Sequence, residues 1–274
     1  MNRKAPLSAR LLFCLSLFFF ASCQKIHFDD FLNPDNTPKL CLVKQIISYA
    51  DPEFFLDTLT REFKYNKWGD PVSIELIPAQ PSIPDFFFLY DNQHRLTDFV
   101  SAYKNEHFEQ WHHYAYERNR IVRDTVRVFG TIVNGQPVED EKYSPYTTIH
   151  HFEYDLHNRI VKETFPFSIF PPQLTMIITY SYDQAGNLSR VTTYVPEFNN
   201  TNEINYSSYD NKLNIHRTNK VWMLIDRDYS VNNRIRAENY NQFGLPLKFR
   251  SPGNTYPFVY GHNISESDIK YECK

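Results

Sequence analysis

Aromatic and β-branched residues alternate with polar ones along most of the chain. The clearest runs are Arg95–Tyr103, Arg120–Phe129, Thr175–Tyr182 and Leu188–Val195. A period of two places every second side chain on the same face of a strand, and these residue types favour strands. No stretch after residue 22 shows a convincing helical period. The pattern therefore predicts an all-β protein.

A short block recurs between these runs: an aromatic residue, any residue, tyrosine, then Asp or Asn, with Gly or Asn three positions later. The best copies contain Tyr90-Asp91, Tyr154-Asp155 and Tyr182-Asp183. An Asp or Asn side chain starts a turn by accepting hydrogen bonds from nearby backbone amides. Gly or Asn then tolerates the left-handed conformation of a short hairpin loop. Each block therefore predicts a β-hairpin tip. The key tyrosines are Tyr65, Tyr90, Tyr116, Tyr154, Tyr182, Tyr209 and Tyr240.

The block resembles the tyrosine–aspartate (YD) repeat of Rhs-type and teneurin-type shells. It is also similar to a family of lipoproteins that carry loose copies of the repeat behind a signal peptide. The resemblance covers about residues 40–272 and implies an antiparallel meander of repeated β-hairpins forming a twisted sheet. Rhs shells are far longer and enclose a cargo. Encapsulation is not implied for a chain with about seven copies.

The N-terminus has the order of an export signal: a basic head, a ten-residue apolar run from Leu11 to Phe20, and small residues before Cys23. The run is half the roughly twenty residues that a membrane-spanning helix needs. Its end resembles the lipobox of bacterial lipoproteins, which implies that Cys23 carries a diacylglycerol and an acyl chain such as palmitate. A plain secretory signal and a retained anchor remain alternatives. We expect a signal peptide at 1–22, a tether at 23–39 and a YD-repeat-like β domain at 40–274.

Loss of Arg3, Lys4 and Arg10 with the signal changes the net charge from −3 to −6. An acidic chain lacks the basic footprint of a nucleic-acid-binding protein, so we expect no nucleic-acid partner. The lipid anchor makes the membrane a partner and predicts a place in a Gram-negative cell envelope, on the outer membrane. The sequence leaves open whether the protein faces the periplasm or the cell surface.

Two cysteines remain in the mature domain, Cys41 and Cys273, at its opposite ends and within strand-like runs. In an oxidising compartment they could form a disulfide. Two separate thiols are the alternative. Their spacing does not suggest a zinc site.

The sequence offers no specific catalytic constellation. The doublets His112-His113 and His150-His151 stand at equal offsets before Tyr116 and Tyr154. A shared metal site would need further ligands that the pattern does not place, so we predict polar partners of aromatic rings and no metal. The repeat aspartates, including Asp210, could be imagined as paired carboxylates of a glycosidase, but their turns account for them. We therefore predict no catalytic residues and no cofactor.

Aromatic residues are the remaining indication of function. Most should form the core, but Tyr and Trp are also favoured at binding surfaces. We single out Trp68, Trp111 and Trp222 as candidate ligand-facing aromatics. The sequence favours a non-enzymatic, lipid-anchored binding or scaffold protein with a glycan or an envelope protein as partner. The alternative is an envelope enzyme acting on polysaccharide.

Overall fold

The protein is a single antiparallel sheet of sixteen strands, which confirms the predicted all-β meander. The computed structural model describes residues 41–51, 56–167, 174–234, 237–250 and 266–273. The strands are β1 (Cys41–Asp51), β2 (Leu56–Tyr65), β3 (Pro71–Ile77), β4 (Asp85–Tyr90), β5 (Leu96–Ala102), β6 (His107–Glu117), β7 (Arg120–Val133), β8 (Gln136–Glu139), β9 (Thr148–Tyr154), β10 (Ile160–Pro166), β11 (Thr175–Tyr182), β12 (Leu188–Val195), β13 (Asn200–Asn205), β14 (Ala237–Tyr240), β15 (Pro246–Arg250) and β16 (Glu266–Cys273).

Neighbours in the sheet are mostly neighbours in the chain. The order runs from β13 back to β1 and continues through β16 and β15 to β14, while β8 pairs only with β7. The last strand therefore lies beside the first. A disulfide joins Cys41 of β1 to Cys273 of β16, with their Cα atoms 4.0 Å apart. The sequence left open whether these cysteines form a disulfide or remain separate thiols. The bond holds the two ends of the β domain together.

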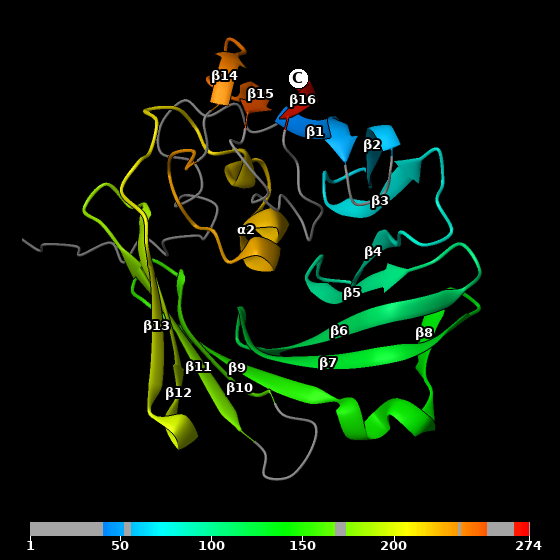
Figure 1. Ribbon diagram of the computed structural model, residues 1–274. Coiled ribbons are helices and arrows are strands. Elements are labelled where there is room, and N and C mark those ends of the chain that lie inside the picture. The colour runs from blue at the N-terminus through cyan, green and yellow to red at the C-terminus, as the bar shows by residue number, and fades with distance from the viewer. Residues whose placement is uncertain (1–40, 52–55, 168–173, 235–236, 251–265, 274) are drawn as a thin grey trace, which may run out of the picture.

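A short buried helix fills the hollow of the sheet. Figure 1 shows the strands curving around α2 (Lys220–Asp226). The other helical turns are η1 (Glu141–Tyr146), η2 (Pro196–Phe198) and η3 (Ile215–Thr218). Trp222 of α2 is fully buried and meets Phe63 and Phe88 edge to face. We call the sheet face around α2 the inner face and the opposite one the outer face. Among the described residues, no helix has the length and apolarity to cross a membrane.

The helix corrects the prediction that no helical segment follows residue 22. Its residues Val221 to Ile225 are all buried. A segment that is apolar on every side has no amphipathic period to detect. The predicted hairpin tip at Tyr209-Asp210 is also wrong. Asp210 instead accepts amide hydrogen bonds from Lys212 and Asn233, and so closes the long connection that contains α2.

The other blocks form hairpin tips by the predicted mechanism, except at Tyr116, where Glu117 stands in place of the Asp or Asn. One oxygen of Asp91 accepts hydrogen bonds from the amides of Gln93 and Arg95, each at 2.9 Å. Asp155 repeats this arrangement, and Asp183 accepts from the amide of Asn187. The third residue after each aspartate has a positive φ, 58° at His94 and 85° at Gly186. The repeat aspartates are therefore held in turns.

The repeat tyrosines connect successive hairpins. Each hydroxyl donates to a backbone carbonyl in an earlier part of the sheet, and burial raises the pKa of Tyr154 to about 12. A buried carbonyl needs such a partner, so the repeated tyrosine fixes one hairpin on the previous one. The pairs are Tyr65 to Val43, Tyr90 to Pro71, Tyr116 to Leu96, Tyr154 to Ile121, Tyr182 to Ile160 and Tyr209 to Leu188. Tyr271 of β16, outside the repeat, donates to Pro246 in the same way. Tyr240 is the exception among the repeat tyrosines, because its hydroxyl hydrogen-bonds to the Asp210 carboxylate and to the carbonyl of Ala237 in its own strand.

Candidate functional site

Charged side chains gather on the inner face of β6 to β10. In register, Asp124 of β7 lies opposite Tyr114 of β6 and His150 of β9. Glu163 of β10 lies opposite Phe152, two residues after His150. Since side chains two residues apart share a face, strand alternation alone brings these groups to the same side. We call Asp124, Glu163, His112, His150 and Arg227 the inner cluster.

The inner cluster is a closed set of ion pairs and hydrogen bonds. His112 Nδ1 lies 2.8 Å from Asp124 Oδ2, and His150 Nδ1 lies 2.7 Å from Glu163 Oε1. Arg227, directly after α2, reaches both carboxylates. Its Nε is 3.2 Å from Glu163 Oε2, and its Nη2 is 4.0 Å from Asp124 Oδ2. The guanidinium also lies over the ring of Phe152. The cluster thus joins the connection containing α2 to four strands.

Electrostatics keeps two members of this cluster, Glu163 and Arg227, ionised. Burial alone would raise the pKa of Glu163, but the Arg227 guanidinium and the hydrogen bond from His150 outweigh it and lower the pKa to about 2. Burial would likewise lower the pKa of Arg227, but the Glu163 carboxylate outweighs it and raises that pKa. A glycosidase needs one carboxylic acid with a raised pKa to protonate its leaving group. Glu163 is shifted in the opposite direction.

Access also argues for a structural role. The side chains of Asp124 and Glu163 are 1% and 7% exposed. A saccharide could not reach them without displacing α2 and its connection. The sequence singles out His112 and His150 of this cluster but not Asp124, Glu163 or Arg227. One feature of the sequence could have indicated the cluster: a charged residue at a strand position that alternation places on the buried face. Asp124 is such a residue, two positions before buried Val126.

The histidine doublets are divided between the two faces. His112 and His150 point inward to carboxylates, and His150 also stacks on Phe165 with ring centroids 4.0 Å apart. His113 and His151 take the outer face, where both are exposed. The predicted role of the doublets as polar partners of aromatic rings fits these contacts. The His112 ring lies near Phe99 and stacks on Tyr114, although His112 itself is buried against Asp124. Within the described residues, no group of three or more His, Cys, Asp or Glu side chains could hold a metal ion.

The outer face carries the more accessible constellation, on β5, β6 and β7. Asp98 Oδ1 accepts the indole N–H of Trp111 at 2.7 Å and lies 2.7 Å from His113 Nδ1. The guanidinium of Arg127 lies over the Trp111 ring, 4.5 Å from its centroid, and pairs with Glu139. The His113 side chain is 46% exposed and Trp111 is half-buried. We call Asp98, Trp111, His113 and Arg127 the outer patch.

The outer patch combines an aromatic ring with fixed donors and acceptors on one surface. The strand register brings these residues together, because Trp111 lies opposite Arg127 and His113 lies opposite Asp98. Such a set can bind a polar ligand through hydrogen bonds and ring contact. Of the three candidate tryptophans, Trp111 belongs to this patch. Trp68 is 58% exposed on the β2–β3 turn and lies against His94. Trp222 is 0% exposed, so its prediction as ligand-facing is wrong: it packs in the core.

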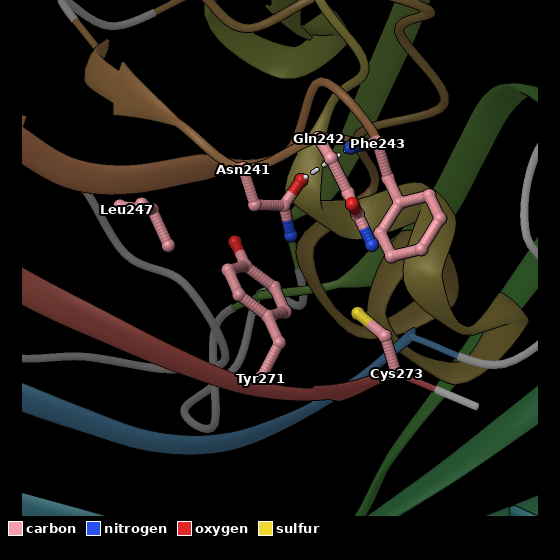
Figure 2. Close-up of a pocket in the computed structure, with 6 residues that line it drawn as sticks. All are labelled: Asn241, Gln242, Phe243, Leu247, Tyr271 and Cys273. Carbon is pink, nitrogen blue, oxygen red and sulfur yellow. Dashed lines mark hydrogen bonds between the residues drawn. The ribbon is translucent and has the colours of Figure 1, made fainter.

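A small hollow lies beside the disulfide. Figure 2 shows Tyr271 and Cys273 of β16 below the β14–β15 turn, from which Gln242 and Phe243 extend. The space is about 370 Å³ and is also lined by Asn241 and Leu247. The Asn241 side-chain oxygen accepts the amides of Phe243 and Leu245, and Tyr271 donates to Pro246. These polar groups serve the turn. The candidate lipidation site Cys23 lies outside the described residues.

No protein-family model and no curated protein sequence matches the chain. Among solved structures, the chain is similar to a porin-like protein from Bacteroides uniformis at 10% identity and a TM-score of 0.46, over 84% of this chain and 96% of that one. It is also similar to the TcdB2–TccC3 complex with Cdc42 at 17% identity and a TM-score of 0.23, over 73% of this chain. The chain spans 12% of the length of that second protein. We transfer no activity from either.

Proposed function

We propose that this chain is a lipid-anchored, non-enzymatic binding protein of the bacterial cell envelope. The observation that supports binding is the contrast between its two sets of titratable groups. The inner cluster is closed on itself and buried, whereas the outer patch presents Trp111 and His113 to solvent around a shared carboxylate, Asp98. The surface, and not the interior, is therefore where a ligand would bind.

The anchor is proposed from the sequence alone, from the apolar run ending at Ala21-Ser22-Cys23. Its test is the mass of the protein extracted from membranes. We expect a mature N-terminus at Cys23 with acyl chains attached. Cys23→Ser should release the protein from the membrane, while the control Cys14→Ser, within the signal, should leave the acylated mass unchanged. An unmodified Cys23, or a chain retaining residues 1–22, would contradict the anchor. Protease treatment of intact cells then distinguishes the two faces of the outer membrane.

For the outer patch we propose a glycan as ligand. Carboxylate, imidazole and guanidinium groups next to an indole match the hydroxyls and the apolar ring faces of a sugar. A glycan array probed with the mature protein tests this. Trp111→Ala combined with His113→Ala should abolish binding, and His151→Ala, an exposed histidine elsewhere on the outer face, should not.

Two results would contradict the glycan proposal. One is binding that the double variant leaves unchanged. The other is capture of an envelope protein with no glycan bound. A panel of polysaccharide hydrolase substrates run in parallel addresses the enzymatic alternative. Turnover that is lost in Asp98→Asn would replace binding by catalysis.

A further inference from the structure

All hairpin tips of the repeat lie at one end of the sheet. The turns after β2, β4, β6, β9, β11 and β14 are separated by an even number of antiparallel strands, so they share an edge. Adjacent tips touch. The ring of Trp68 lies 4.0 Å from that of His94, and Arg95 Nη1 is 3.5 Å from the carbonyl oxygen of Arg118. We call this edge the tip rim.

The composition of the tip rim differs from that of the whole chain. The exposed residues of the turns include the apolar Trp68 and Leu156 and the basic Lys67 and Arg118. Leu156 is 96% exposed and Trp68 is 58% exposed. The exposed residues of the six described tips include three basic side chains, Lys67, Arg118 and Arg120, and two acidic ones, Glu117 and Asp183, whereas the whole chain has a net charge of −3. Two other acids of the turns, Asp91 and Asp155, face Arg95 and Arg159.

The chain also enters the β domain at this edge. Cys41 opens β1 beside the rim, since Val43 accepts the hydroxyl of Tyr65, the last residue before the first tip. Cys273 lies at the same end, and Figure 2 shows it below Gln242 and Phe243 of the last tip. Only residues 24–40 separate Cys41 from Cys23. Even fully extended they span about 60 Å at roughly 3.5 Å per residue.

We propose that the tip rim rests on the bilayer that holds the lipid anchor, with Trp68 and Leu156 inserted at the headgroup level and Lys67 and Arg118 beside lipid phosphates. Trp is enriched at that depth of a membrane, and Lys and Arg flank it. A short tether raises the local concentration of the rim at the surface, so a weak contact is populated. This inference rests on the proposed lipidation of Cys23. The outer patch lies within β5, β6 and β7 and not at the rim.

The test uses the acylated full-length mature protein in vesicles of phosphatidylethanolamine and phosphatidylglycerol. A nitroxide is attached to Leu156→Cys or, as control, to Gln136→Cys, which is exposed on the turn region at the opposite end of the sheet. We expect the label at 156 to be several-fold more accessible to lipid-soluble oxygen than to a water-soluble nickel complex, and the label at 136 to show the reverse. Equal aqueous exposure of both labels would overturn the proposal.

A second measurement protects the test against misfolded variants. Brominated lipids should quench part of the tryptophan emission of the unlabelled protein, and Trp68→Phe should remove that quenched part. Quenching that persists in Trp68→Phe, or is absent from the start, contradicts rim contact. The intact mass of the same sample separates this failure from that of the anchor. Acylated protein with an aqueous rim refutes the rim contact alone, whereas protein lacking acyl chains refutes the lipidation.

Discussion

His112 and His113 are consecutive residues of β6 with the same partner type and opposite surroundings. His112 Nδ1 lies 2.8 Å from Asp124, and His113 Nδ1 lies 2.7 Å from Asp98. The first pair is buried on the inner face. In the second pair, on the outer face, the His113 side chain is 46% exposed and the Asp98 side chain 13%. The two Asp–His pairs therefore have nearly the same distance, and the face of the sheet determines whether a ligand can reach the histidine.

Because the inner pair is buried, its charges need a further partner. A charge removed from water must be compensated, so Asp124 and Glu163 require Arg227, which comes from outside the meander. The outer pair needs no cation from another segment, because the Trp111 indole donates to Asp98 and water reaches the exposed side of His113. One Asp–His pair thus belongs to the attachment of the α2 connection, and the other is available to a ligand. Each of the following changes tests this division.

The largest effect is expected for Arg227→Met. The substitution keeps much of the apolar stem but leaves two buried carboxylates without their cation, which costs about 3–5 kcal/mol of unfolding free energy. Urea unfolding of the mature protein measures it. The matched control is Arg190→Met, because Arg190 forms an exposed pair with Glu203 at 3.7 Å. That loss should be about 0–1 kcal/mol. Equal losses in the two variants would remove the distinction between the faces.

The second largest effect is expected from acid, which should lower the unfolding free energy through Glu163 of the inner cluster. The folded-state pKa of Glu163, about 2, lies below the ordinary glutamate value near 4.3. Its contribution is therefore fully present above that ordinary value and is lost as pH falls from about 4.5 toward 2. The loss is of order 3 kcal/mol. Urea midpoints between pH 6 and pH 2, compared with those of Glu163→Gln, isolate it. If Glu163→Gln lost as much stability between pH 6 and pH 2 as the native protein does, Glu163 would not be the source of that loss.

The sequence predicted the repeated part of the fold well, because its determinants are local. β11 and β12 were predicted at their observed bounds, Thr175–Tyr182 and Leu188–Val195. Strand alternation on both sides and the turn residues Asp183 and Gly186 leave little choice of register. The insertion of a buried helix has no such local signal.

The candidate site could be predicted only in part. Trp111, a candidate ligand-facing aromatic, is half-buried, and its partner Asp98 and the cation above it come from neighbouring strands. Trp222 carries the same residue type and is buried. Accessibility is set by the curvature of the sheet around α2, and no short pattern encodes that. The pairing of Arg227 with Asp124 is likewise a contact between distant segments.

A smaller effect separates two tyrosines of the β11–β12 hairpin. The hydroxyl of Tyr182 donates to the carbonyl of Ile160 at 3.1 Å, and Tyr182 packs against the main core. Tyr182→Phe should cost about 0.5–1.5 kcal/mol, the net value of one hydrogen bond. Tyr194→Phe, on the half-buried outer side of β12, is the control and should change stability less. Paired urea curves decide, and a larger loss at Tyr194 would contradict the role assigned to the repeat tyrosines.

The smallest change in stability is expected at the residue most exposed to a ligand. His113→Asn removes one partner of Asp98, which keeps the Trp111 indole hydrogen bond and contact with water, so unfolding free energy should shift by about 0.5 kcal/mol or less. His112→Asn, one residue earlier, disturbs buried Asp124 and should cost about 1–3 kcal/mol. Both variants replace a histidine of β6 by asparagine, so they differ only in the face of the sheet that they change. A stability loss at His113 as large as that at His112 would mean that the outer patch is a structural element, and a glycan-binding loss confined to His113→Asn would mean that it is not.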